Sequence, residues 1–228
     1  MRRIAILGGT GPEGMGLGLR FAQAGDAVVL GSRQADRAVE SAARATEQLH
    51  AIGVEARVSG AENRAAVVDA DVVVLTFPFA GVRELLPPLA DALAGRVVLD
   101  VINPMVRINK VFSVERVPEG SAAELIQQLL PQSFVVSAFK NESAEELNAL
   151  AHPLHGDVVV CSDHAEARGR ILELVRGIPQ YRPVDAGALI NARALEHLTA
   201  LLLNINKRHG AVTSIQILGL QDGGERPA

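Results

Sequence analysis

Aromatic side chains and cysteine are scarce in this sequence. Its 228 residues include no tryptophan, one tyrosine and one cysteine. A single cysteine excludes an internal disulfide and any thiolate metal cluster. Because the apolar run 158–160 directly precedes Cys161, we interpret this residue as a buried structural thiol. The shortage of aromatic residues also argues against a protein that stacks on nucleic-acid bases.

Long apolar runs and a strong excess of one charge are lacking as well. The formal net charge is −4, and 48% of the residues are hydrophobic, which indicates an ordinary soluble protein without a bias towards nucleic acid. No run approaches the roughly 20 apolar residues of a membrane span. Residues 4–7 are apolar but too few for a signal peptide. We therefore expect a cytoplasmic protein that binds neither nucleic acid nor membrane.

Glycine is concentrated near the amino terminus, between an expected strand at 4–7 and an expected helix at 15–24. The turn reads Gly9-Thr10-Gly11-Pro12-Glu13-Gly14, a G-x-G-x-x-G. In this setting the first glycine permits a tight turn, the second lets a pyrophosphate approach the backbone, and the third lets helix and strand pack closely. The helix start then faces the phosphates. The context favours dinucleotide binding over a glycine turn in another α/β protein.

The second expected strand, residues 27–30, carries no acidic residue at its end. NAD enzymes usually have an Asp or Glu there, which binds the ribose 2′-hydroxyl. This chain has Ser32 and Arg33, with Arg37 one helical turn further on. A guanidinium forks onto phosphate, so we interpret the three residues as a clamp for the 2′-phosphate of NADP(H). The carboxylate of Asp36 could cancel part of the positive potential of this clamp. The alternative is that both arginines are solvated surface residues.

Strand-like and helix-like segments alternate through the first two thirds of the chain. We expect further strands at 55–59, 71–77, 96–102 and 134–139, and helices at 35–52, 82–93 and 121–130. A proline pair at 87–88 predicts a kink, and Ser121 with Glu124 forms a capping box. The alternation predicts an α/β fold, a doubly wound parallel sheet of the Rossmann type, over residues 1–150.

Residues 151–228 are expected to form a small α+β part that completes a substrate cleft. We expect strands at 157–161 and 212–220, helices at 165–176 and 191–207, and a frayed end at 221–228. The long helix has a wide apolar face, which either packs on the sheet or forms the seam of a homodimer. His152 and His155 have the spacing of metal ligands, but Pro153 lies between them, and we expect no metal site.

Several segments of the chain, taken in order, carry a resemblance to a known family. They are Ile6-Leu-Gly-Gly-Thr-Gly-x-x-Gly14, Gly31-Ser-Arg33, Val74-Leu-Thr-x-Pro78, Ser121-Ala-Ala-Glu124, Val135-Val-Ser-Ala138, Pro183-Val-Asp-Ala-Gly187, Asn191-Ala-Arg193, Glu196-x-Leu-Thr199 and Leu203-Asn204. Over nearly its whole length the chain resembles the NADPH-dependent reductases of coenzyme F420, an 8-hydroxy-5-deazaflavin. The resemblance implies hydride exchange between NADP(H) and the deazaflavin.

The resemblance also implies positions for the cofactor. Residues 10–13 would cradle the pyrophosphate, Phe77, Pro78 and Asn103 would lie along the ribose and nicotinamide, and Ala138 would lie against the nicotinamide ring. We expect the second substrate to contact a further set of residues. These are Lys140, Asn141, Leu203 and Lys207. The anionic tail of the coenzyme could meet a basic group at 207–209 or another at 107 and 110, although either group could simply be solvated.

One segment departs from the family. After the Ser-Ala pair the family can show His-Thr-Ile-Pro, whereas this chain has Phe139-Lys140-Asn141-Glu142-Ser143. Lys140 and Glu142 bring charges to what should be a flat, largely apolar slot. Lys140 is the candidate cation beside the pyrimidine ring of the reduced deazaflavin, and the alternative is a surface lysine at a strand end.

Hydride transfer between two rings depends on stacking and distance, roughly 3 to 3.5 Å between the reacting atoms. The cofactors carry the chemistry and the protein orients them, so we expect no obligate catalytic side chain. Two other functions stay open. One is an NADPH-dependent reductase of a ketone or imine, with Lys140 or a histidine as proton donor. The other is a non-catalytic NADP(H)-sensing protein whose long helix docks a partner.

Overall fold

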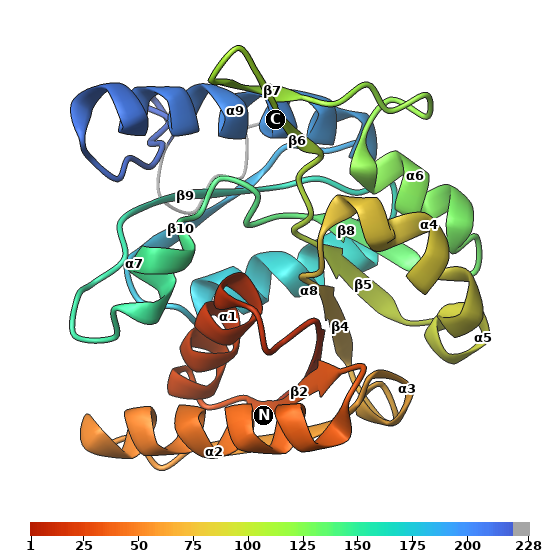
Figure 1. Ribbon diagram of the computed structural model, residues 1–228, viewed down its shortest axis with the longest axis vertical. Helices are drawn as coiled ribbons and strands as arrows, with labels where there is room; N and C mark the ends of the chain where they lie inside the picture. Colours follow the sequence, from red (N-terminus) through yellow and green to blue (C-terminus); the bar gives the residue numbers. More distant parts are fainter. Residues whose placement is uncertain (221–228) are drawn as a thin grey trace, which may run out of the picture.

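A computed structural model describes residues 1–220 of the chain, and a six-stranded parallel sheet forms its centre (Figure 1). The strands lie in the order β3-β2-β1-β4-β5-β8. Their bounds are Arg3–Leu7 for β1, Ala27–Ser32 for β2, Arg57–Glu62 for β3, Val72–Leu75 for β4, Val97–Asp100 for β5 and Phe134–Ser137 for β8. This is the order of the doubly wound dinucleotide-binding sheet, which confirms the predicted fold class.

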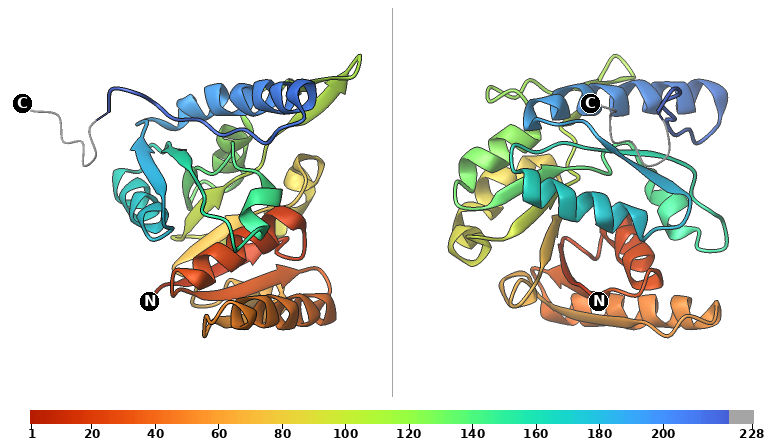
Figure 2. Two further views of the ribbon diagram at one scale, coloured as in Figure 1. Left: turned by 90° about the vertical axis from the view of Figure 1, so that its left-hand side faces the viewer. Right: turned by 180° about the vertical axis from the view of Figure 1, so that it is seen from behind.

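Helices cover both faces of the sheet, because successive side chains of each strand point to opposite faces. Ile4 and Ile6 of β1 join one core, beneath α1 (Pro12–Gln23), α2 (Ala35–Ala51) and α8 (Ala165–Arg176). Ala5 and Leu7 join the other core, which includes α6 (Ala122–Leu129) and the short helices α3 (Asn63–Ala66), α4 (Val82–Leu85) and α5 (Ala90–Leu93) (Figure 2). Burial on both faces explains why the strands read as continuous apolar runs.

The predicted helices agree best with the structure where their apolar period is clear. Helix α8 matches the expectation for 165–176 residue by residue. The segment 82–93 breaks at its proline pair into α4, the 3-10 turn η2 (Pro87–Leu89) and α5. Helix α6 is capped as predicted, with the hydroxyl of Ser121 accepting from the backbone N–H of Glu124 at 3.1 Å. Helix α1 begins earlier than predicted, with Pro12 in its first turn.

Some elements were not predicted. An antiparallel hairpin of β6 (Met105–Ile108) and β7 (Val111–Val114) stands between β5 and β8. A short helix, α7 (Ala144–Asn148), follows β8, and two further 3-10 turns are η1 (Phe79–Gly81) and η3 (Leu189–Asn191). These segments are too short for a periodic pattern to identify.

The last third adds a β-α-β unit and a long helix. Strands β9 (Gly156–Val160) and β10 (Tyr181–Asp185) pair in parallel, and a single antiparallel bridge between Ser137 and Cys161 joins them to β8. Cys161 is fully buried, as predicted. Helix α9 (Ala192–His209) crosses the end of the molecule opposite α2 (Figure 1). Strand β9 and helix α8 pack in the same core as β1. The predicted division of the chain into two parts at residue 150 stays a prediction.

The prediction of a strand at 212–220 is wrong, because this segment forms no strand. Side chains instead hold its backbone: the Asp157 carboxylate accepts from the N–H of Ile217, and the Arg182 guanidinium donates to the carbonyl of Ile217 at 2.6 Å. The frayed end expected at 221–228 lies outside the described residues. Within residues 1–220, no helix is both long and apolar enough to cross a membrane.

Candidate functional site

Two cavities open at the carboxyl ends of the parallel strands, where doubly wound sheets bind ligands. The first, cavity A, has a volume of about 440 Å³. The second, cavity B, has a volume of about 370 Å³. Both are lined by Gly11, Thr76, Phe77 and Pro78, so they are two parts of one cleft. The predicted site residues Phe77 and Pro78 therefore lie where the two cavities meet.

The glycine turn is built as its sequence predicts. A Cβ on Gly14 would lie 2.7 Å from the Cα of Gly9 and 2.9 Å from the carbonyl oxygen of Gly8, so only glycine lets α1 start this close to β1. Gly9 and Gly14 are buried behind the turn. At Gly11 a Cβ would meet protein only at 3.4 Å, and this residue faces both cavities. The turn thus presents bare backbone and the start of α1 to the cleft, a setting suited to an anion.

Cavity A contains the predicted phosphate clamp. Ser32 at the end of β2, together with Arg33 and Arg37, lines it with Thr10. Both guanidinium groups are exposed, and within residues 1–220 neither forms an ion pair with Asp36 or any other acid. Two unpaired arginines that face a cavity are free to bind an anionic ligand.

Cavity B takes its walls from several elements. Pro12 and Glu13 come from α1, Asn103 follows β5, Glu142 follows β8, and Thr199 comes from α9. Phe139 and the backbone of Lys140 complete the wall. Helix α9 thus contributes Thr199 to the wall of cavity B, and the role of residues 151–228 in completing a substrate cleft stays a prediction.

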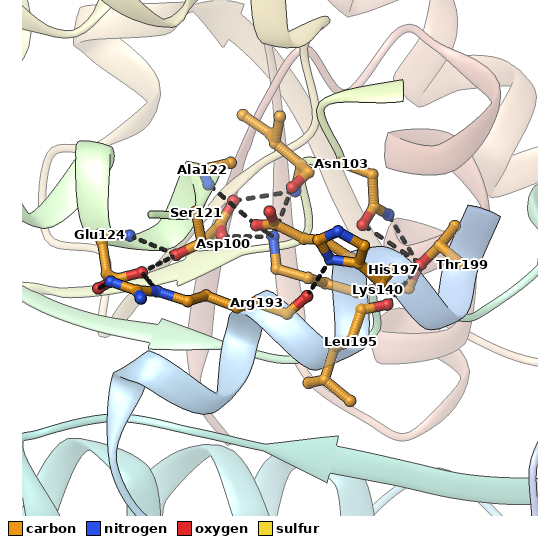
Figure 3. A network of polar contacts seen from close by, with 12 residues as sticks. Asp100, Asn103, Ser121, Ala122, Glu124, Lys140, Arg193, Leu195, His197 and Thr199 are labelled. Carbon is orange, nitrogen blue, oxygen red and sulfur yellow. Dashed lines mark hydrogen bonds and ion pairs between the residues drawn. The ribbon is translucent and has the colours of Figure 1, made fainter. Parts of the chain in front are cut away.

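Lys140 does not present its charge to the cleft. Its side chain is fully buried, with Nζ lying 2.7 Å from Oδ2 of Asp100 and 3.2 Å from Oε1 of Glu196. Figure 3 shows the ammonium directed at Asp100, away from Asn103 and Thr199. The interpretations of Lys140 as a surface lysine and as a cation or proton donor facing the substrate are therefore both wrong.

The buried ion triad of Asp100, Lys140 and Glu196 joins three elements. Burial alone would lower the pKa of the Lys140 ammonium, but the two carboxylates outweigh it and raise that pKa. Asp100 also accepts from the N–H of Ile102 at 2.9 Å, and Glu196 accepts from the N–H of Ala122 at 3.0 Å. A buried charge is tolerated when it is paired and hydrogen-bonded in this way. The triad fixes α9 to the end of β5 and to the start of α6.

A second polar network holds α9 against cavity B. The Thr199 hydroxyl donates to the carbonyl of Lys140 at 2.9 Å, and the Asn103 amide donates to the same carbonyl at 2.8 Å (Figure 3). The Asn141 amide donates to the Thr199 hydroxyl at 2.8 Å. Asn103 lies on the wall of cavity B, whereas Asn141 lies outside it, against a third cavity.

Two acidic side chains in cavity B carry perturbed carboxyl groups. Burial raises the pKa of Glu13 to about 8, with a further contribution from the nearby charge of Glu142. Burial also raises the pKa of Glu142 to about 7, although the Tyr181 hydroxyl donates to it and opposes the shift. Near neutral pH this acidic pair therefore holds at least one proton for much of the time.

Three predicted contacts lie elsewhere. Ala138 is fully buried, so in this structure it forms no part of the cavity surface against which a ring could lie. Leu203 and Lys207 line neither cavity. The Lys207 ammonium donates to the carbonyl of Lys110 at 2.7 Å, so the two basic groups considered for the anionic tail, 207–209 and 107–110, lie together at one end of α9.

Several residues that line the cleft were given no site role from the sequence, and three of them come from different elements. Asn63 follows β3, Thr76 follows β4, and Thr199 lies on α9. The hydroxyl of Thr76 donates to the carbonyl of Leu7 at 2.9 Å and so ties the β4 loop to the glycine turn. Its place directly after an apolar strand could have identified it, because that edge of the sheet carries the site. In residues 1–220 the structure gathers no group of His, Cys, Asp or Glu that could hold a metal ion.

The strand order, the glycine turn and the cleft at the carboxyl edge define a dinucleotide-binding protein of the doubly wound class. Comparison with known proteins is more specific. Residues 3–104 match the family described as NADP oxidoreductase, coenzyme F420-dependent. The chain belongs to this family, because a full-length relative confirms the match. That relative, the F420-dependent NADP reductase of Methanocaldococcus jannaschii, is 36% identical over 222 residues, which are 96% of this chain and 99% of the relative.

Other relatives agree. The F420-dependent NADP reductase of Methanothermobacter thermautotrophicus is 37% identical over 211 residues, covering 91% of this chain and 90% of the relative. Among solved structures, a candidate F420-dependent NADP reductase from Arthrobacter sp. FB24 aligns with a TM-score of 0.78 at 22% identity, covering 96% of this chain and all of that one. The structural likeness supports the fold, and the sequence relatives confirm the family that the motifs predicted.

Proposed function

We propose that this chain transfers hydride between NADP(H) and coenzyme F420. The observation that carries the proposal is the joining of cavity A, with its unpaired arginines, to cavity B at Phe77 and Pro78. A dinucleotide long enough to span both cavities would place its phosphorylated ribose at one end and its nicotinamide at the other. Family membership supports coenzyme F420 as the second substrate.

The residues present fit NADP(H). Ser32, Arg33 and Arg37 would hold the 2′-phosphate, and the bare backbone from Thr10 to Gly11 would receive the pyrophosphate. Glu13 stands beside that backbone, and its raised pKa limits the repulsion that an ionised carboxylate would exert on a phosphate. When bound, NADPH would supply the hydride and coenzyme F420 would accept it. The chain's part is to hold the two rings face to face and to exclude water.

We propose no obligate catalytic side chain for the hydride step itself. The wall of cavity B includes Phe77, Phe79 and Phe139, and aromatic side chains suit stacking more than covalent chemistry. No single substitution on its wall should lower the rate by more than about 10³-fold, since larger losses are typical of triad or nucleophile chemistry.

We further propose that the protein acts as a homodimer in the cytoplasm. Exposed apolar side chains lie on α9 and on the hairpin beside it: Leu201 is 55% exposed, Ile108 56% and Val111 53%. Contact between the two elements is fixed by the N–H of Phe112, which donates to Asn204 at 2.9 Å. Sedimentation should find a dimer that Leu201→Glu converts to a monomer. A monomeric wild type would contradict the proposal.

The proposed function is tested by following the absorbance of oxidised coenzyme F420 on addition of NADPH or NADH. NADPH should bleach the coenzyme and NADH should do so far more slowly. Absence of bleaching with both, in a protein that binds NADPH, would contradict the activity. Equal rates would contradict the role of the arginines.

A further inference from the structure

The structure assigns a proton-donating role to Glu13 and Glu142 in cavity B. We propose that this carboxyl pair supplies the proton that is consumed along with the hydride when the deazaflavin is reduced. The inference rests on the proposed function and adds catalytic residues to it. Its basis is the placement of two acids on the wall of the cavity that would receive the reacting rings.

The position of the pair is the first observation. Glu13 reaches cavity B from the first turn of α1, and Glu142 reaches it from the segment after β8. Their charges interact, and in the described part of the chain neither forms an ion pair with a basic residue. Two carboxyl groups that share a site without a cation cannot both ionise easily, so the pair retains a proton.

A route to solvent is the second observation. Glu142 also lines a third cavity, cavity C, of about 200 Å³, together with Tyr181, Glu146 and His155. Among the described residues, Glu142 is thus the one that cavities B and C share. The Tyr181 hydroxyl donates to the Glu142 carboxylate and fixes its orientation. A carboxyl group on a residue shared by the two cavities can give a proton towards cavity B and regain one from solvent through cavity C.

The other titratable groups near the pair are held by partners, are poor proton donors, or lie outside cavity B. The Lys140 ammonium is held by Asp100 and Glu196. The Arg20 guanidinium donates to the carbonyls of Glu146 and Leu147 at 2.9 Å each. Tyr181 is a poor proton source because burial raises its pKa. His155 and Glu146 border cavity C alone. Glu13 and Glu142 are therefore the acids that face cavity B with a removable proton.

The hydride and the proton leave different donors and reach different atoms of the deazaflavin. The C4–H bond of the dihydronicotinamide breaks with its electron pair, and a C–H bond forms at C5 of the deazaflavin, so the nicotinamide is oxidised and the deazaflavin is reduced by two electrons. The O–H bond of the carboxyl pair breaks and an N–H bond forms at N1 of the pyrimidine ring. The resulting carboxylate regains a proton from the bulk solvent, supplied as hydronium or by a buffer acid, through cavity C, so the reaction consumes one solvent proton overall.

The first test needs no substrate. Carbon-detected NMR of glutamate side chains in the ligand-free protein should find carboxyl groups that titrate near the values of about 7 and about 8, as a coupled pair. In Glu142→Gln one of these titrations should disappear and that of Glu13 should move lower, because a neighbouring charge is lost. If every glutamate titrates near 4.5, the ordinary value, the proposal is overturned.

The second test is single-turnover hydride transfer from bound NADPH to coenzyme F420, followed across pH. A donor works in its protonated form, so the wild-type rate should fall as pH rises through about 7 to 8. Glu142→Gln should be slower by about 100-fold, at the low end of general acid catalysis, and should lose this limb. Glu13→Gln should move the limb to lower pH. The matched control is Glu145→Gln, an exposed residue of α7 that lines none of the three cavities, and it should behave as wild type.

The outcomes separate the two proposals. A wild type that reduces the deazaflavin at no pH contradicts the proposed function. An active wild type whose rate and pH dependence survive in both Glu142→Gln and Glu13→Gln contradicts the proton-donating pair while leaving the function in place.

Discussion

The two ends of the cleft hold charge in opposite ways. At cavity A, Arg33 and Arg37 are exposed and have no acidic partner among residues 1–220. At cavity B, Glu13 and Glu142 have lost water and hold protons more tightly, while the adjacent Lys140 turns inward to its own partners. A cationic side chain that binds an anionic ligand has to remain solvated while the ligand is absent. A buried charge has to be neutralised or paired.

The largest effect on stability should come from breaking the buried ion triad of Asp100, Lys140 and Glu196. Lys140→Met leaves Asp100 and Glu196 buried without their cation, and we expect the free energy of unfolding to fall by about 3–5 kcal/mol. Urea unfolding measures it. The control, Arg170→Ala, breaks an exposed pair with Glu166 and should cost less than about 1 kcal/mol. Similar losses for the two variants would contradict a structural role for the triad.

A substitution among the unpaired arginines of cavity A should change the selectivity for NADPH over NADH instead of stability. Arg33→Asp removes charge-assisted hydrogen bonds to the 2′-phosphate worth about 1.5–3 kcal/mol, so kcat/KM with NADPH should fall about ten- to 100-fold. With NADH the rate should hold or rise. Steady-state kinetics with both nucleotides check this, and an unchanged NADPH/NADH ratio would remove the clamp.

The pH dependence of the free energy of unfolding should reveal the raised pKa of Glu13 in cavity B. The folded pKa of Glu13, about 8, lies above its ordinary value of 4.5. Between these values the folded state binds more protons than the unfolded state, so the free energy of unfolding should fall as pH rises from about 5 to 9. Urea unfolding of Glu13→Gln should show a flatter pH dependence than wild type. An identical slope would mean that Glu13 titrates normally.

The smallest effect should come from Ser32, which shares the clamp with the arginines. The Ser32 hydroxyl already accepts from the N–H of Gln34 at 3.2 Å, and a neutral hydrogen bond contributes about 0.5–1.5 kcal/mol. Ser32→Ala should therefore weaken NADPH binding by no more than about tenfold, as isothermal titration can measure. A loss larger than that of Arg33→Asp would reverse the assigned roles.

The same contrast separates what the sequence could predict from what it could not. The glycine turn and the arginines after β2 lie within one β-α-β unit, where strand order and backbone geometry fix their positions. Lys140 was placed wrongly because its direction depends on Asp100 and Glu196, which come from β5 and α9. Glu13 was predicted as a cofactor contact and Glu142 as a charge in the substrate slot, but their raised pKa values were not predicted, because burial and the contact of Glu142 with Tyr181 depend on distant parts of the chain. Local patterns predict elements, whereas burial depends on the whole fold.

The arrangement of the cleft is tested most directly by a crystal structure of this protein soaked with NADP⁺. The 2′-phosphate should lie between Ser32, Arg33 and Arg37, the pyrophosphate against Gly11, and the nicotinamide in cavity B beside Glu13. A nucleotide that leaves the glycine turn empty, or whose nicotinamide lies outside cavity B, would contradict it.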